Sequence, residues 1–123
     1  MATILIVEDE APIAHVLSVW LRQHGYTVAL ARNGQEALEL LSTTAVDLIV
    51  SDMNMPVMDG LTLVRTLRKE RGLSLPFLLL SARCDQAQLA ADLKPFDVQL
   101  YPKPFMPSRL VSEIEKALSA VTS

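Results

Sequence analysis

Cysteine is almost absent from this 123-residue chain: Cys84 stands alone, so no disulfide can form within it. A lone cysteine is typical of proteins kept in a reducing compartment, and we expect a cytoplasmic location. Long apolar runs are also missing, because none approaches the roughly 20 residues that a membrane span requires. The opening segment, MATILIVEDE, has no basic residue ahead of its apolar run, so we expect a strand there rather than a signal peptide.

Neither sign of charge dominates the chain. Its net charge of −3 at pH 7 gives no electrostatic reason to expect nucleic acid or an anionic membrane as a direct partner. Half of the residues are hydrophobic and a fifth are charged, as in ordinary folded domains. A chain of this length can bury a core without disulfides, and we expect one domain spanning residues 1–123.

Short apolar runs rich in β-branched residues alternate with longer segments of helical period. The expected strands are Thr3–Val7, Tyr26–Ala31, Asp47–Ser51, Pro76–Ser81 and Val98–Tyr101. The expected helices are Pro12–His24, Asn33–Leu41, Gly60–Arg71, Cys84–Leu93 and Pro107–Val121. Asn33 is expected to cap the second helix, and Trp20 to lie in the core beneath the first. This alternation predicts a doubly wound α/β domain with a parallel sheet covered on both faces.

Polar side chains follow four of the five expected strands. In chain order they are Glu8, Asp9 and Glu10, then Asp52 and Asn54, then Ser81, then Lys103. The carboxyl ends of parallel strands share one edge of the sheet, where ligands bind in such folds. Clustered carboxylates repel one another and rise in pKa unless a cation lies among them. Oxygen ligands with no His or Cys nearby suit a hard ion, and Mg²⁺ is the abundant candidate.

A lysine and a hydroxyl opposite such an ion suit an anionic group, of which phosphoryl is the obvious one. An aspartate carboxylate can itself be the nucleophile and form an aspartyl-phosphate. Transfer then requires in-line positioning and neutralisation of the phosphoryl oxygens. Taken singly, Asp52 is an ordinary turn residue and Lys103 an ordinary surface lysine. Their combination with Asp9 and Ser81 favours the hypothesis that Asp52 is phosphorylated.

Four stretches, ILIVEDE, DLIVSDMNMPVMDG, LLLSAR and KPF, together carry a resemblance. Over its whole length the sequence resembles the receiver domain of two-component response regulators, with these stretches in that family's order and spacing. The resemblance implies a flavodoxin-like sheet of strand order 2-1-3-4-5, with five helices on both faces. It also implies a phosphorylation-activated signalling switch. The phosphoryl group would come from a histidine kinase, a phosphotransfer protein or a small donor such as acetyl phosphate.

The resemblance implies a metal site in which Asp52, the phosphoacceptor, and Asp9 bind Mg²⁺. The backbone carbonyl of Asn54 would be a further ligand, and Glu8 would act on the ion through water.

The same resemblance assigns the phosphoryl contacts. Ser81 would bond one phosphoryl oxygen and Lys103 another, and a cis peptide would join Lys103 to Pro104. Such a domain would not be an enzyme beyond catalysing its own phosphorylation and dephosphorylation.

The chain departs from the family pattern at two places. The family usually has an aromatic switch residue three positions before the lysine, where this chain has Leu100, and the aromatic is Tyr101 instead. A shift of one residue in a strand puts a side chain on the opposite face. Either Pro102 alters the register or the aromatic switch is absent. In addition, KPFD, residues 94–97, replaces the small Gly-Ala pair that commonly precedes the fifth strand.

The resemblance implies output through the fourth helix, fifth strand and fifth helix, to a downstream protein or a second copy in a homodimer. We expect a stand-alone receiver, because only Thr122 and Ser123 follow the last expected helix. The alternative is a degenerate receiver that binds partners without phosphate. A Mg²⁺-dependent phosphatase would need a D-x-D arrangement that VEDEAP lacks, and a flavodoxin would need a hydroxyl-rich loop after the first strand.

Overall fold

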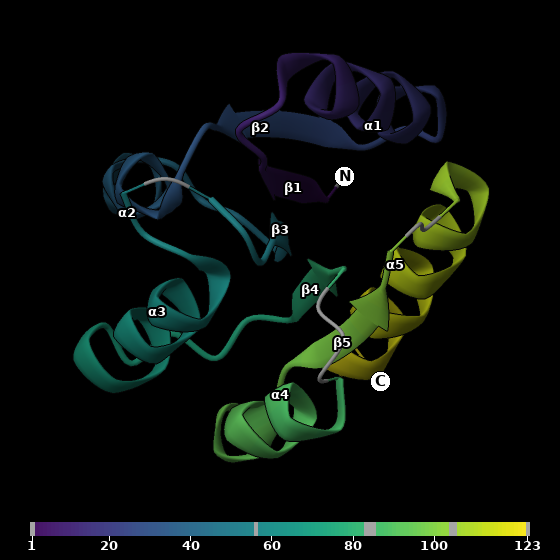
Figure 1. The fold of residues 1–123 in the computed structure, drawn as a ribbon. Coiled ribbons are helices and arrows are strands. Elements are labelled where there is room, and N and C mark those ends of the chain that lie inside the picture. Colours follow the sequence, from purple (N-terminus) through teal and green to yellow (C-terminus); the bar gives the residue numbers. More distant parts are fainter. Residues whose placement is uncertain (1, 56, 83–85, 104–105, 123) are drawn as a thin grey trace.

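A parallel sheet of five strands forms the centre of the molecule (Figure 1). The computed structural model describes residues 2–55, 57–82, 86–103 and 106–122. The strands are β1 (Thr3–Val7), β2 (Thr27–Ala31), β3 (Leu48–Asp52), β4 (Phe77–Ser81) and β5 (Gln99–Pro102). All neighbouring pairs are parallel, and their order is β2-β1-β3-β4-β5. The expected fold class and strand order are therefore confirmed.

Five α-helices connect and follow these strands. They are α1 (Ala11–Gln23), α2 (Gly34–Thr43), α3 (Gly60–Arg65), α4 (Gln86–Leu93) and α5 (Pro107–Thr122). The chain leaves α3 through a π-helical turn, η1 (Thr66–Glu70), and α4 through a 3-10 turn, η2 (Lys94–Phe96). Residues 84 and 85, at the start of the expected fourth helix, lie outside the described residues.

The apolar runs of the central strands explain why the helices cover both faces. Every residue of β3 and β4 is buried. Alternate residues of a strand face opposite sides, so two core clusters form. The α4-side cluster packs under α2, α3 and α4, and includes Leu5, Ile49, Leu67, Leu79, Leu89, Leu93 and Phe96. The α5-side cluster packs under α1 and α5, and includes Ile4, Ile6, Leu17, Leu78, Leu80, Leu110 and Ile114.

Local sequence signals set the start of α2 as predicted. The Asn33 side chain accepts a hydrogen bond of 2.9 Å from the backbone N–H of Glu36, which satisfies one free donor of the first turn. The Glu36 carboxylate in turn accepts from the backbone N–H of Arg32 at 3.0 Å. In the described part of the chain, no helix combines the length and hydropathy needed to cross a membrane.

α1 buries a narrower face than its apolar pattern suggests. Its buried residues recur every three or four positions and are Ala14, Leu17, Ser18 and Leu21. The expectation that Trp20 lies in the core is wrong, because its side chain is 37% exposed. Its ring stacks on His24, with the ring centroids 6.2 Å apart. Leu17, Trp20 and Leu21 share one broad helix face, but the sheet covers only the part of it that holds Ala14, Leu17, Ser18 and Leu21. Trp20 lies at the edge of that part.

Candidate functional site

Three carboxylates meet at the carboxyl edge of the sheet. β1 and β3 are neighbours and Val7 pairs with Ser51, so the residues that come next lie together. Glu8, Asp9 and Asp52 each offer an oxygen atom, and these atoms all lie within 4.8 Å of one another. Glu8 and Asp52 are buried, at 4% and 7% exposure, whereas Asp9 is exposed. The structure therefore brings together the acids that follow the first and third strands.

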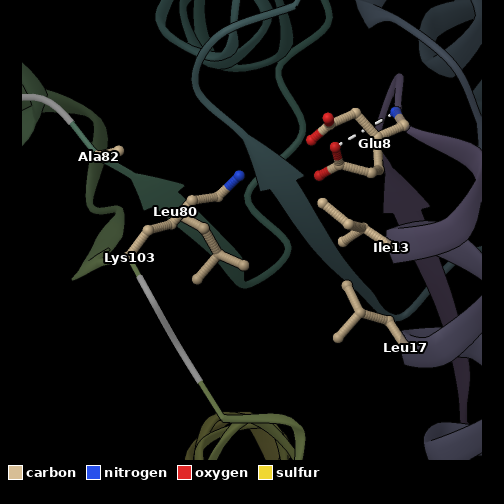
Figure 2. A pocket seen from close by; sticks show the side chains of 7 residues that line it. Glu8, Ile13, Leu17, Leu80, Ala82 and Lys103 are labelled. Carbon is tan, nitrogen blue, oxygen red and sulfur yellow. Dashed lines mark hydrogen bonds between the residues drawn. The ribbon is translucent and has the colours of Figure 1, made fainter.

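Lys103 places a positive charge against Asp52. Its Nζ lies 2.7 Å from Asp52 Oδ1. Its backbone N–H donates to the Ser81 carbonyl at 2.8 Å, which extends the pairing of β4 and β5 beyond Pro102. This hydrogen bond fixes the backbone of Lys103 beside the end of β4. In Figure 2 its side chain extends towards the side of the pocket from which Glu8 projects.

Burial and neighbouring charges shift the pKa of two of these groups. Burial raises the pKa of Glu8 to about 7, the negative charge of Asp52 adds to the rise, and Lys103 opposes it. Burial by itself lowers the pKa of Lys103, but the hydrogen bond to Asp52 and the charge of that carboxylate outweigh burial, so the pKa is raised. Lys103 is therefore charged at neutral pH. Its single positive charge does not balance the negative charge of the carboxylate group.

This donor set suits a hard divalent cation. The candidate ligands are carboxylate oxygens, two of them buried, and Mg²⁺ prefers oxygen ligands. A divalent ion would also offset the electrostatic repulsion between the carboxylates of Glu8 and Asp52. The residues present therefore fit Mg²⁺, and Asp9 and Asp52 stay the predicted direct ligands. Asn54 follows Asp52 by two residues, in the loop after β3, and its carbonyl stays a predicted ligand.

Two predictions remain at this edge of the sheet, the phosphoryl contact of Ser81 and the cis peptide before Pro104. Ser81 is the buried last residue of β4, and its carbonyl accepts the Lys103 N–H. The contact of its hydroxyl with a phosphoryl oxygen stays a prediction. Pro104 lies outside the described residues, and with it the predicted cis peptide after Lys103.

Gly60 lets the loop after Asp52 return closely against β3. A Cβ atom at this position would lie 2.9 Å from the Asp52 carbonyl oxygen and 2.5 Å from Leu79 Cδ1. The Gly60 N–H donates to the Met53 carbonyl at 2.9 Å, and Asp59 caps α3 by accepting from Thr62 N–H at 2.8 Å. The Asp-Gly pair signals a turn in the sequence, but the close approach of that turn to β3 depends on tertiary packing.

β5 keeps a regular register through its two unusual positions. Leu79 pairs with Leu100 and Leu80 with Tyr101, so Pro102 does not displace the strand. Leu100 packs against the α4-side cluster, and Tyr101 against the α5-side cluster. The regular pairing excludes the interpretation in which Pro102 alters the register, and the alternative, that the aromatic switch is absent, stays a prediction.

An apolar pocket of about 540 Å³ opens beside Lys103 (Figure 2). Its apolar lining consists of Ile13 and Leu17 of α1, Leu80 of β4 and the adjacent Ala82. Glu8, Glu10 and Lys103 supply its charged groups. The lysine is thus reachable from the α1 side of the sheet edge.

Comparison with known proteins decides the family. The sequence profile of the response regulator receiver domain matches residues 4–115. The chain belongs to the response regulator receiver domain family. This receiver domain is 36% identical over 119 residues to response regulator MprA of Mycolicibacterium vanbaalenii, a match that covers 97% of this chain and 51% of that protein. The chain spans about half the length of the curated relatives it matches.

Solved structures of other receiver domains share the fold. The receiver domain of a signal transduction histidine kinase from Syntrophus aciditrophicus aligns with a TM-score of 0.88 at 36% identity, covering 98% of this chain and 92% of that chain. Chemotaxis response regulator CheY4 of Vibrio cholerae aligns with a TM-score of 0.85 at 31% identity, covering 95% of this chain and 98% of that chain. The protein is thus a receiver domain of two-component signalling, a phosphorylation-activated switch.

Proposed function

We propose that this receiver domain accepts a phosphoryl group on Asp52, with Mg²⁺ held by Asp9, Asp52 and the Asn54 backbone carbonyl, and with Glu8 acting through water. The observation that carries the proposal is the 2.7 Å contact of Lys103 Nζ with Asp52 Oδ1, inside a group of three carboxylates. A surface turn would need neither the buried acid nor the paired lysine.

The positions of these groups support a direct transfer. A carboxylate oxygen of Asp52 attacks the phosphorus of a phosphohistidine donor, and the O–P bond forms as the N–P bond breaks. The electron pair of that bond leaves with the imidazole. Lys103 exchanges its contact with Asp52 for a phosphoryl oxygen, and Ser81 contacts another. Bound Mg²⁺ supplies further neutralisation of the phosphoryl oxygens.

Hydrolysis of the aspartyl-phosphate returns the switch to its resting state. Water attacks phosphorus, the Asp52 O–P bond breaks, and inorganic phosphate leaves. The domain catalyses both steps on its own Asp52. The Lys103–Asp52 ion pair then forms again.

The proposed donor follows from this chemistry, and the proposed output surface follows from the receiver family. The donor is a histidine kinase or a phosphotransfer protein, and a small acyl phosphate can replace it. The output surface is α4, β5 and α5, which binds a downstream protein or a second copy of the chain. A single receiver domain over residues 1–123 and a cytoplasmic location stay predictions.

Intact mass spectrometry after incubation with phosphoramidate tests the proposal. With Mg²⁺, the wild type should gain the mass of one phosphoryl group, and chelation of the ion should slow the gain at least tenfold. Asp52→Asn should gain nothing. Asp59→Asn is the matched control, because Asp59 is an acid of the same loop that caps α3, and it should behave as wild type. Equal phosphoryl uptake by Asp52→Asn and wild type would overturn the assignment.

A further inference from the structure

Arg68 ties the end of α3 to the turn that precedes β5. It lies in η1, and its guanidinium donates to three backbone carbonyls. Nε donates to Phe96 at 2.8 Å, Nη1 to Leu73 at 2.7 Å and Nη2 to Asp97 at 3.4 Å. A planar guanidinium suits several acceptors at fixed angles, which a lysine ammonium does not. Arg68 therefore links segments that are 28 and 29 residues away in the chain.

The turn that Arg68 holds is poorly closed by its own backbone. The Asp97 N–H reaches the Lys94 carbonyl only at 3.5 Å, the long limit of a hydrogen bond. Asp97 has a φ of 55°, a left-handed conformation that few residues other than glycine, asparagine and aspartate adopt. The carbonyls at the end of a short helical turn lack helical partners, and the guanidinium supplies them.

A second contact from η1 reinforces the first. Lys69 Nζ lies 5.6 Å from the centroid of the Phe96 ring, within the range of a cation–π interaction. Phe96 is 8% exposed and belongs to the α4-side cluster. Two successive residues of η1 thus hold the same turn. Arg68 contacts the backbone carbonyls of Phe96 and Asp97, and Lys69 contacts the Phe96 ring.

The turn held by Arg68 lies in the chain between Ser81 and Lys103, the two residues proposed to contact the phosphoryl group. Ser81 ends β4, Lys103 follows β5, and α4, η2 and Asp97 lie between them. α4 comes before the anchor, and β5 begins two residues after it. A shift of β5 would move Lys103 relative to Asp52, whereas α4 is separated from Lys103 along the chain by the anchored turn.

We propose that Arg68 is a fixed pivot that confines the response to phosphorylation to α4 and holds the start of β5, and so Lys103, in place. The inference rests on the proposed phosphorylation of Asp52. It makes Arg68 a positioning residue, since in the described hydrogen bonds its guanidinium contacts only the last residue of η2, Asp97 and Leu73.

Hydrogen exchange of the unphosphorylated protein tests the anchor by itself. In Arg68→Ala, peptides covering residues 94–98 should exchange about tenfold faster than in wild type, because three charge-assisted hydrogen bonds are lost. Arg68→Lys keeps the charge but not the planar fork, and it should give an intermediate rate. Arg65→Ala removes an exposed cation of α3 and should leave these peptides unchanged. Unchanged exchange at 94–98 in both Arg68 variants would overturn the anchor.

Hydrogen exchange after phosphoramidate treatment tests the confinement, with phosphoryl uptake read from intact mass. In phosphorylated wild type, the change should cover residues 86–93 and stop before residue 94. In phosphorylated Arg68→Lys or Arg68→Ala, it should extend to residues 99–102. A wild-type change that already spans β5, or a variant change that still stops at residue 93, would overturn the pivot. Absence of phosphoryl uptake in wild type would instead count against the proposed function, while the unphosphorylated comparison still decides the anchor.

Discussion

Leu100 and Tyr101 are neighbours on β5 whose side chains lie in different core clusters. Leu100 packs on the α4 side of the sheet, and Tyr101 on the α5 side. The Tyr101 hydroxyl donates to Glu113 Oε2 at 2.9 Å, which joins β5 to α5. This chain thus has an aliphatic side chain facing α4 three residues before Lys103, and its aromatic ring is held by α5.

Tyr101→Phe should destabilise the fold by about 1–2 kcal/mol, because it removes a hydrogen bond to a partly buried carboxylate. Urea unfolding followed by circular dichroism measures the loss. The same bond should appear in a spectrophotometric titration, because burial and then Glu113 raise the pKa of Tyr101 to about 12. Glu113→Gln is the matched control, since it keeps a neutral acceptor and should cost less. Equal stability of Tyr101→Phe and wild type would show that the bond contributes nothing.

Lys103→Ala should leave two buried carboxylates without their cation. We expect a loss of about 1–3 kcal/mol in metal-free buffer at pH 8, and a smaller loss when Mg²⁺ is present, because the ion neutralises the same group. Urea unfolding with and without Mg²⁺ gives both values. The variant should still take up phosphoryl but should show no change in hydrogen exchange afterwards. A loss that is the same in both buffers would argue against a shared electrostatic role for the lysine and the ion.

Glu8 should make the metal-free protein less stable as pH rises. Its pKa is about 7 in the folded state against an ordinary value of 4.5, so the folded state binds the proton more tightly. The stabilisation is fully present below pH 4.5 and is lost as pH rises through 7, with a total of roughly 3 kcal/mol at most. Urea unfolding in EDTA at pH 5, 6, 7 and 8 should therefore show a decline in wild type that is reduced in Glu8→Gln. Parallel declines in the two proteins would contradict this origin.

Val57→Asn should stabilise the protein by about 1 kcal/mol. Val57 has a φ of 69°, a left-handed conformation that is unfavourable for a β-branched residue and better tolerated by asparagine. Its side chain is 81% exposed, so the substitution removes little packing. Thermal unfolding measures the gain. Val57→Thr keeps the branch at Cβ and should give no gain, and a lower melting temperature for Val57→Asn would contradict the argument.

The sheet and the acidic site were predictable because they depend on short-range patterns. Apolar runs such as Leu48–Val50 mark buried strands, and the carboxyl ends of parallel strands share one edge, so the residues after them meet. The order of the strands came from the resemblance, because periodicity does not determine which strands are neighbours.

The remaining features depend on contacts that are distant in the chain. No local pattern indicates that Arg68 reaches Phe96, or that Tyr101 finds its partner in α5. The burial of Trp20 was predicted wrongly because helical periodicity identifies an apolar face but not which part of it the sheet covers. Helix and strand types can be read from a sequence, whereas such pairings follow from how the elements pack.

The most direct measurement is the chemical identification of the phosphorylated residue. Phosphoramidate-treated protein is reduced with borohydride, which converts an aspartyl-phosphate to homoserine, and the peptides are sequenced by mass spectrometry. Our account predicts homoserine at position 52 in wild type, dependent on Mg²⁺. Homoserine at Asp9 or Asp59, or at no position in protein that has gained a phosphoryl group, would contradict it.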